Sequence, residues 1–252
     1  MSPQTILITG ATGKIGQCLT RHFRTKGWDV IAVSRNAGRL DTLERESHGQ
    51  GALHKIDIDL TGESAAVQLA THLSSQGPLP HHLINNARDI TNLKLPASGH
   101  PNRVQWRQEF ELGVVVAHDL TFALAEVAQS RLRSVVNVGS IYGVVAMNPR
   151  LYNDPAREAP IHYGVTKAAL IHMTKELAVR LAARGIRVNC VSYGGVAGRA
   201  NEEFRERYAA SVPAGTMLDE HDIPGAIDFL TSPSASGITG HNLLVDGGWT
   251  AW

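Results

Sequence analysis

Short apolar runs alternate with longer stretches of helical periodicity along the whole chain. The short runs have the length of buried strands and lie at 6–9, 30–33, 53–58, 83–84, 134–138, 187–191 and 242–245. Between them, apolar side chains recur every three to four residues, for example at 65–73 and 163–183. Strands that alternate with helices in this way indicate βαβ units in a parallel sheet. We therefore expect an α/β fold with a doubly wound sheet of Rossmann type.

The 252 residues contain no composition break or flexible linker, so we expect one domain spanning 1–252. The stretches 78–101 and 146–160 are rich in turn-forming residues and interrupt the regular pattern. Long loops beside a rigid sheet usually carry function. Residues 146–160 are therefore expected to form a substrate loop.

Composition excludes several classes of function. The formal net charge is +1 and Lys and Arg form no block, so we expect neither a nucleic-acid nor a membrane partner. The first apolar run is too short for a membrane span and lacks the features of a signal peptide. Cys18 and Cys190 match no metal or redox spacing, which favours a cytoplasmic protein with reduced thiols.

Twelve histidines raise the question of a metal site. Among them, His81 and His82 are adjacent in the sequence, and neighbours on a chain seldom face one ion together. The spacings that zinc sites require are missing. We expect these histidines to be solvated on the surface, and we expect no metal cofactor.

A glycine-rich loop follows the first expected strand and leads into a helical stretch. Glycines let the backbone turn sharply and approach a pyrophosphate, whose charge is met by amides at the helix N-terminus. A tight turn between strand and helix is the alternative, but this context favours a dinucleotide site. The residues expected to contact the cofactor here are Gly10, Thr12, Gly13, Lys14, Ile15 and Gly16.

The second expected strand ends at Ser34 and Arg35, without an acidic residue. An Asp or Glu at this point binds the adenosine ribose of NAD, whereas an Arg can pair with the additional phosphate of NADP. Lys14 adds positive charge nearby. We therefore expect NADP rather than NAD, although Arg35 could also be a solvated loop residue.

Tyr163 and Lys167 are four residues apart in a helical stretch, which places both side chains on one face. A phenol in water ionises near pH ~10, and a neighbouring ammonium favours its ionised form. Tyr163 could therefore exchange protons as an acid/base. Gly139 and Ser140 follow the strand-like run 134–138, and the Ser140 hydroxyl could bind the substrate oxygen at the same edge of the sheet.

Together these features resemble the classical short-chain dehydrogenase/reductase family over essentially the whole chain. The further matching motifs are Asp59-Leu60-Thr61, Asn85-Asn86-Ala87, Arg187-Val188-Asn189, Gly194-Gly195-Val196, Thr239-Gly240 and Asp246-Gly247-Gly248. The resemblance implies an oxidoreductase with Ser140, Tyr163 and Lys167 as catalytic residues.

The resemblance also assigns cofactor contacts and an assembly. It implies that Asp59 and Leu60 flank the adenine, that Asn86 and Ala87 line the cofactor, and that Lys167 binds the nicotinamide ribose. Val196 would lie near the nicotinamide carboxamide. A homo-oligomer, tetramer or dimer, is implied as well, and residues 198–208 would form either a lid over the substrate or a surface helix.

The chain departs from the family pattern at several positions. Lys14 stands where the middle glycine of the loop is usual, a spacing more like the extended subfamily. Arg88 replaces the glycine after Ala87, and Tyr193 replaces a proline. Arg88 could bind a carboxylate or phosphate of the substrate, or extend into solvent. The family's helical asparagine is missing, and alignment puts Glu111 at its position, where it could relay protons or pair with Lys167.

The loop 146–160 is longer than usual for the family and rich in polar residues, which favours a sugar or sugar acid as substrate. A looser resemblance, to dehydrogenases of surface-glycan or sialic-acid-like sugar pathways, points the same way. We thus expect an NADP(H)-dependent interconversion of a carbonyl and a hydroxyl on a polar small molecule. The alternatives are a nucleotide-sugar epimerase or dehydratase, and a non-catalytic protein that senses NADP(H).

Overall fold

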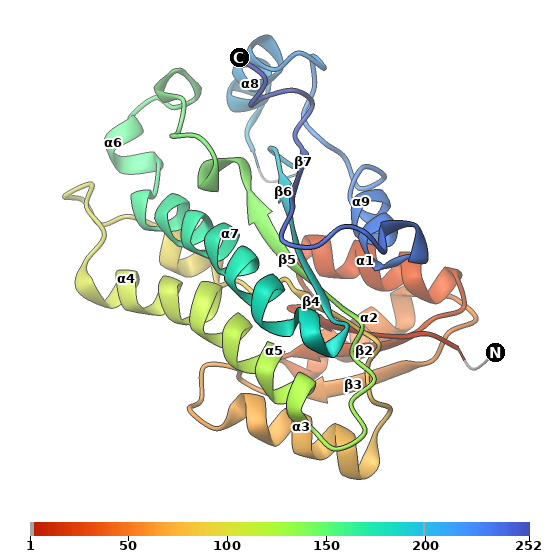
Figure 1. Ribbon diagram of the computed structural model, residues 1–252. Coiled ribbons are helices and arrows are strands. Elements are labelled where there is room, and N and C mark those ends of the chain that lie inside the picture. Colours follow the sequence, from red (N-terminus) through yellow and green to blue (C-terminus); the bar gives the residue numbers. More distant parts are fainter. Residues whose placement is uncertain (1–2, 199) are drawn as a thin grey trace.

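The computed structural model describes residues 3–198 and 200–252, and its strands and helices alternate as expected (Figure 1). The strands are β1 (Thr5–Thr9), β2 (Asp29–Ser34), β3 (Leu53–Asp57), β4 (His82–Asn85), β5 (Ser134–Ser140), β6 (Arg187–Tyr193) and β7 (Asn242–Val245). The helices are α1 (Lys14–Thr25), α2 (Ala37–Glu46), α3 (Ala65–Gln76), α4 (Arg103–Phe110), α5 (Val116–Glu126), α6 (Pro155–Glu158), α7 (Ile161–Leu181), α8 (Glu202–Ser211) and α9 (Pro224–Thr231). Shorter 3-10 turns lie at Ile90–Leu93, Ile141–Gly143, Pro149–Leu151, Ala182–Arg184 and Pro233–Ala235, and a π-helical turn lies at Glu111–Val115.

The strands form one seven-stranded sheet in the order β3-β2-β1-β4-β5-β6-β7, and each pair is parallel. The expected doubly wound sheet is confirmed. The strand order reverses between β1 and β4, where the chain crosses from β3 back past β1. Because the strands are parallel, their carboxyl ends meet at one edge, and the reversal opens a crevice there.

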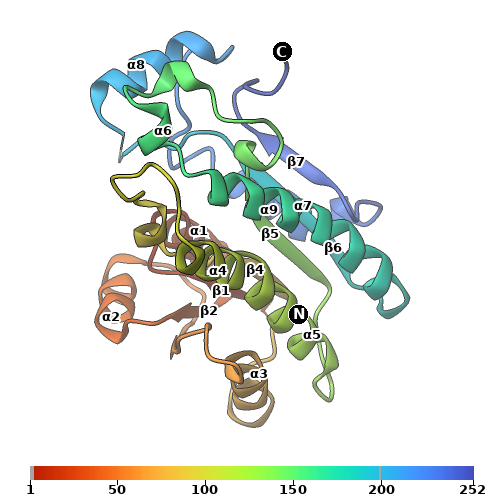
Figure 2. The same ribbon diagram turned by 90° about the vertical axis from the view of Figure 1, so that its left-hand side faces the viewer.

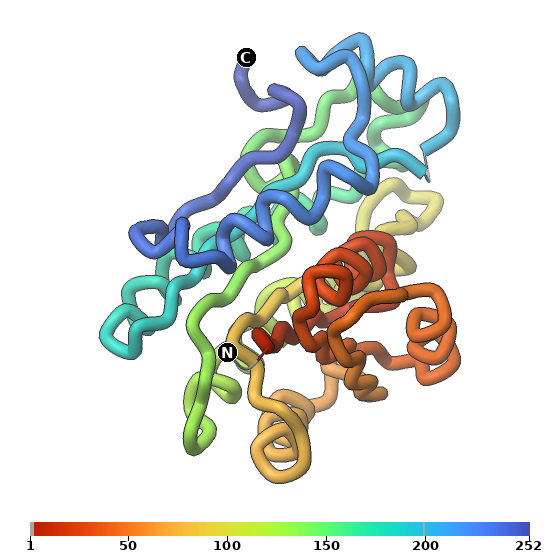
Figure 3. The backbone as a smooth tube through the Cα atoms, turned by 90° about the vertical axis from the view of Figure 1, so that its right-hand side faces the viewer, coloured from red at the N-terminus to blue at the C-terminus, as the bar shows by residue number. Residues whose placement is uncertain are grey.

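Helices cover both faces of the sheet because successive side chains of each buried strand point to opposite sides. Ile6 and Ile8 belong to the apolar cluster under α1, α2 and α9, whereas Leu7 belongs to the cluster under α3, α5 and α7. Figure 2 shows α4, α5 and α7 along one face, and Figure 3 shows α1 and α9 on the other. The sheet is therefore buried on both sides.

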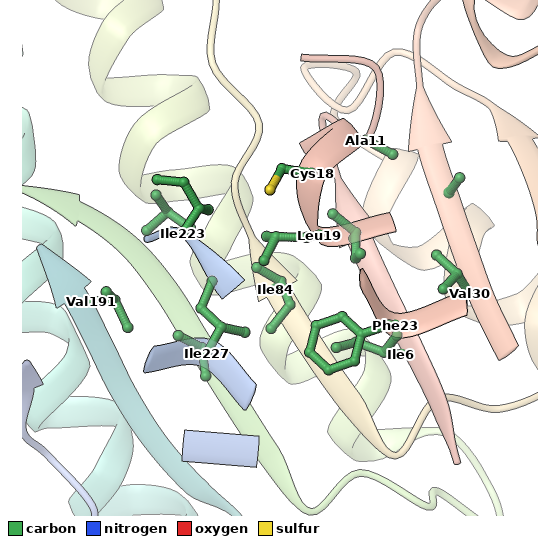
Figure 4. Close-up of a cluster of buried hydrophobic side chains, with 14 of the residues drawn as sticks. Ile6, Ala11, Cys18, Leu19, Phe23, Val30, Ile84, Val191, Ile223 and Ile227 are labelled. Carbon is green, nitrogen blue, oxygen red and sulfur yellow. The ribbon is translucent and has the colours of Figure 1, made fainter. Parts of the chain in front are cut away.

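The apolar cluster that contains Ile6 and Ile8 brings together helices from early and late in the sequence. Figure 4 shows Leu19 and Phe23 of α1 lying over the strand residues Ile6 and Ile84, with Ile227 of α9 beside them. All of these side chains are fully buried. Their packing holds α1 against the sheet, and the N-terminus of α1 is thereby fixed beside the crevice.

The expectation that His81 and His82 are solvated is wrong, since they are only 2% and 4% exposed. They enter the sheet at the amino end of β4, where the Thr5 N–H donates to His81 Nδ1 and His82 Nδ1 lies 2.8 Å from Ser134 Oγ. The His82 ring stacks on Trp28 at 5.0 Å. Burial lowers the pKa of His82 to about 3, so the ring is neutral in the folded protein.

The residues that the structure describes contain no group of three or more His, Cys, Asp or Glu side chains placed to hold a metal ion. Nor does any helix in this part of the chain combine the length and hydrophobicity of a membrane span.

Candidate active site

A cleft of about 790 Å³ opens at the carboxyl edge of the sheet, beside the reversal of strand order. The residues predicted for the site that line it are Gly10, Thr12, Gly13, Lys14, Ile15, Arg35, Asp59, Leu60, Asn86, Ala87, Ser140, Tyr163, Lys167 and Val196. Gly16 is the exception among the predicted residues. A Cβ atom at Gly16 would lie 2.7 Å from the Cα of Ala11, so this glycine allows α1 to pack closely against the loop.

The glycine loop has the shape and polarity that a pyrophosphate requires. Gly10 has a φ of +62°, and a Cβ there would lie 2.8 Å from the Cα of Ala87. Gly13 is the N-cap of α1, and within the described residues no side chain caps the amides of its first turn. Free amides at a helix N-terminus bind anions. The Lys14 ammonium lies beside Gly198.

The end of the cleft at which the adenosine of the cofactor is expected carries an ion pair that the sequence did not reveal. Arg35 Nη2 lies 2.6 Å from Asp89 Oδ2. Burial acts to raise the pKa of Asp89, but hydrogen bonds from Thr91 and Arg35 outweigh it and hold the pKa below its usual value. Asp89 is therefore ionised and competes with any phosphate for the Arg35 guanidinium.

Arg39 is a further lining residue that sequence reasoning missed. Its Nη2 donates a 2.7 Å hydrogen bond to the carbonyl of Thr12, next to Gly13. The available signal was a second arginine in the first turn of the helix that follows Arg35. Asp59 lies at the same end, where the backbone N–H and the hydroxyl of Thr61 donate to its carboxylate and lower its pKa.

At the chemical end, β5 and α7 bring Ser140, Tyr163 and Lys167 to the same cleft. Ser140 is the last residue of β5, and its Oγ accepts a hydrogen bond from the Tyr142 N–H at 3.2 Å. Lys167 is 7% exposed, with its Nζ 5.9 Å from the centre of the Tyr163 ring. The Lys167 Nζ also donates to the carbonyl of Val138 at 2.6 Å. A phenol, a hydroxyl and an ammonium thus converge where a substrate oxygen could be bound and protonated.

Arg88 reaches this triad rather than extending away from it. Its Cζ lies 4.5 Å from the centre of the Tyr163 ring, and its Nη1 donates to Tyr163 Oη over 3.4 Å. Tyr142 approaches the Tyr163 ring edge-on at 6.5 Å. The chemical end therefore holds two cations, Arg88 and Lys167, close to one phenol.

The helical stretch that includes Glu111 contains a π-helical turn at Glu111–Val115 between α4 and α5. Gly113, within this turn, lines a cavity of about 10 Å³ behind Lys167, roughly the space of one water molecule. The buried carboxylate is that of Glu109, which is 4% exposed. Burial raises its pKa, although the charges of Arg88 and Lys167 act to lower it.

The expected substrate loop supplies Tyr152 to the cleft wall, and α8 supplies Phe204 and Tyr208. Tyr142 Oη and Tyr152 Oη form a 2.6 Å hydrogen bond, and the rings of Tyr152 and Phe204 meet edge-on at 5.6 Å. The loop and α8 therefore form one wall of the cleft. Arg199, within the expected lid, lies outside the described residues.

Tyr193, at the position where the family usually has proline, is 3% exposed. Its hydroxyl donates to the carbonyl of Ile223 at 2.5 Å, which ties the end of β6 to the start of α9. Tyr193 and the following Gly194, Gly195 and Val196 all line the cleft. Tyr193 thus forms part of the cleft wall and links β6 to α9.

Comparison with known proteins places these features in context. A family model described as enoyl-(acyl carrier protein) reductase matches residues 10–250. The chain is 30% identical to the galactitol 2-dehydrogenase (L-tagatose-forming) of Cereibacter sphaeroides over 97% of this chain and 94% of that protein. It is 29% identical to a 3-oxoacyl-(acyl-carrier-protein) reductase of Rickettsia bellii over 98% and 97% of the two chains.

Solved structures match the fold over the same extent. A short chain dehydrogenase from Leptospira borgpetersenii with bound NAD+ aligns with a TM-score of 0.84 and 28% identity. The alignment covers 98% of this chain and 93% of that one.

Proposed function

Because this chain is an oxidoreductase of the classical short-chain dehydrogenase/reductase family, we propose that it uses NADP(H) to interconvert a carbonyl and a hydroxyl on a polar, sugar-like substrate. The observation that carries the proposal is the convergence of Ser140, Tyr163 and Lys167 in the cleft that also contains the glycine loop. The free amides of α1 and the absence of room for a side chain at Gly10 support the dinucleotide at that end.

Each residue of the triad has a distinct role. Ser140 binds the substrate oxygen, and Tyr163 gives it a proton during reduction and takes the proton back during oxidation. Lys167, held by the Val138 carbonyl, binds the nicotinamide ribose and stabilises negative charge on the Tyr163 oxygen. When bound, the nicotinamide cofactor supplies or accepts the hydride.

The preference for NADP rests on Arg35, with Arg39 and Lys14 as further cations near the glycine loop. A guanidinium can bind the additional phosphate of NADP through charge-assisted hydrogen bonds. Asp89 opposes this, since it pairs with Arg35. Asp59 and Leu60 flank the adenine in this proposal, and Asn86, Ala87 and Val196 line the remainder of the cofactor.

The sugar-like substrate is supported by the hydroxyl groups of Tyr142 and Tyr152 at the chemical end. The galactitol dehydrogenase, which acts on a polyol, is a relative of similar length. A sensor without turnover would not need Tyr163 and Lys167 in contact with the cleft.

We also propose a homo-oligomer. Val104 on α4 and Val165 on α7 are 57% and 46% exposed, and Phe110 is 39% exposed. These apolar side chains lie on neighbouring helices and would be covered in a dimer or tetramer. Sedimentation equilibrium would measure the assembly.

The test combines cofactor binding with turnover. We expect NADPH to bind more tightly than NADH in fluorescence titrations, and Arg35→Gln to weaken NADPH binding by about 10-fold or more while leaving NADH binding unchanged. Arg45→Gln, an exposed arginine on α2, is the matched control. In a screen of ketoses and polyols, Tyr163→Phe should lower kcat by about 100-fold or more. Tight binding without turnover of any carbonyl would favour the sensor, and equal affinity for both cofactors would reject the NADP assignment.

A further inference from the structure

Arg88 occupies a position from which it can touch a substrate. It lies in the loop that follows β4, next to Ala87. Its side chain is exposed and lines the cleft. Its Nη1 lies 3.4 Å from Tyr163 Oη, the atom that exchanges a proton with the substrate oxygen in the proposed function. Groups attached next to that oxygen therefore come within reach of the guanidinium.

The charges around the cleft leave this end positive. The carboxylates that line the cleft in the described part of the chain are Asp59 and Asp89, both at the adenosine end. Asp89 is paired with Arg35. Glu109 lies near Arg88 and Lys167 but is buried, and burial raises its pKa. Arg88 and Lys167 thus face the substrate space, and the lining carboxylate next to Arg88 in the sequence, Asp89, is already paired with Arg35.

The two cations differ in what they can still bind. Lys167 is 7% exposed, and its ammonium donates to the Val138 carbonyl. Within the described residues, the Arg88 guanidinium makes one hydrogen bond, the long contact with Tyr163 Oη. A guanidinium has five N–H donors in a planar fork that matches a carboxylate. Most of the donors of Arg88 are therefore available to a ligand.

We propose that Arg88 binds a carboxylate on the carbon next to the reacting carbonyl, so that the substrates are 2-oxo or 2-hydroxy acids of the sugar-acid type. This inference rests on the proposed function. A carboxylate on the adjacent carbon is the anion that lies closest to the oxygen held by Tyr163. A phosphate ester at the far end of a sugar would place its charge several bonds away from Arg88. The carboxylate stays unchanged in the reaction and serves to orient the carbonyl.

A matched pair of substrates isolates the carboxylate. The ketose D-fructose and its 2-oxo acid, 2-oxo-D-gluconate, differ only in whether carbon 1 is a hydroxymethyl group or a carboxylate. Corresponding pairs from the other hexuloses and the pentuloses cover the unknown stereochemistry. We expect kcat/KM with NADPH to be about 10- to 100-fold higher for the acid of the preferred pair, as for charge-assisted hydrogen bonds. Arg88→Gln should remove this preference, and Arg88→Lys should retain part of it.

A binding measurement complements turnover. Oxamate carries the carbonyl and carboxylate of a 2-oxo acid, and oxamide is its neutral counterpart. Calorimetric titration into the enzyme with NADP+ should show oxamate binding, weakened about 10-fold or more by Arg88→Gln, and no comparable binding of oxamide. Arg107→Gln, an exposed arginine on α4 outside the cleft lining, is the control and should change neither result.

Each other outcome overturns the inference. Equal kcat/KM for acid and ketose, a preference that survives in Arg88→Gln, or failure of oxamate to bind would each do so. Preference for D-fructose 6-phosphate that depends on Arg88 would assign the arginine to a phosphate instead. Tyr163-dependent turnover of neutral ketoses, unchanged in Arg88→Gln, would reject the carboxylate while leaving the proposed function intact.

Discussion

The Lys167 Nζ donates a 2.6 Å hydrogen bond to the carbonyl of Val138, two residues before Ser140 on β5. This contact joins α7 to β5 inside the cleft, so the helix that carries Tyr163 cannot slide along the strand that carries Ser140 without breaking it. Gly143 reinforces the junction, since a Cβ there would lie 2.7 Å from the carbonyl carbon of Lys167. Lys167 therefore positions the triad as well as supplying charge.

Lys167→Met should lower kcat by about 100-fold or more, because it removes both the charge beside Tyr163 and the bond to β5. Stopped-flow oxidation of NADPH would measure the loss. Lys175→Met, on an exposed turn of the same helix, is the control and should retain wild-type kcat. Near-normal kcat in Lys167→Met would show that Tyr163 works without the lysine.

Asp89→Asn should increase the preference for NADPH over NADH by about 5-fold, because it removes a negative charge 2.6 Å from Arg35. Asparagine keeps the oxygen that accepts the hydrogen bonds of Thr91, so the turn at Ile90–Leu93 should survive. The ratio of the two dissociation constants, measured by fluorescence, gives the result. An unchanged or reduced ratio would mean that Asp89 orients Arg35 for the phosphate rather than competing with it.

Stability should fall as the pH drops below about 6.5. The pKa of His82 is about 3 in the folded protein and ordinary in the unfolded chain, so the unfolded state binds the proton first. The stabilisation is complete above pH 6.5 and is lost toward pH 3, by at most about 1.4 kcal/mol per pH unit for this histidine. Urea unfolding between pH 7.5 and 5 would measure the slope.

The variant His82→Phe should flatten that slope because phenylalanine cannot bind a proton. Its ring can still stack on Trp28, although the bond to Ser134 is lost and overall stability will be lower. His72→Asn, on the exposed face of α3, should keep the wild-type slope. The assignment fails if His82→Phe and His72→Asn depend on pH equally.

Glu109→Gln should raise the thermal unfolding midpoint by a few degrees at pH 8 but not at pH 4.5. Burial raises the pKa of Glu109 in the folded protein, so stability present at low pH is lost as the pH rises through that pKa. Glutamine removes the buried charge without changing the shape. Calorimetry at both pH values would test this, with the exposed Glu63→Gln as control. An equal shift at the two pH values would contradict the electrostatic explanation.

Much of the fold could be predicted because buried parallel strands are nearly continuous apolar runs. The run at Ile6–Ile8 and the stripe of Leu170, Leu177 and Leu181 correspond to core positions. The spacing of Tyr163 and Lys167 places them on one helix face, since residues i and i+4 lie together, and the neighbouring Ser140 strengthened the interpretation as a site. Local periodicity was thus enough to predict the alternation of strands and helices and the shared helix face of Tyr163 and Lys167.

The remaining features depend on contacts between distant segments or on irregular backbone. The pairing of Arg35 with Asp89 joins residues 54 apart in the sequence, and no local pattern announces it. No local pattern announces the π-helical turn either, and it is Gly113 of this turn, rather than Glu111, that shares the small cavity with Lys167. His81 and His82 looked polar in sequence but have partners within the sheet.

The π-helical turn at Glu111–Val115 sets the rotational phase between α4 and α5. An α-helix advances about 100° per residue, so one residue more or less in this turn would rotate α4 by roughly that angle relative to α5. Glu109 would leave its place near Arg88 and Lys167, while Leu120 on α5 would remain in the core. A single-residue deletion in this turn would thus change the charge around Arg88 and Lys167 without altering either cation.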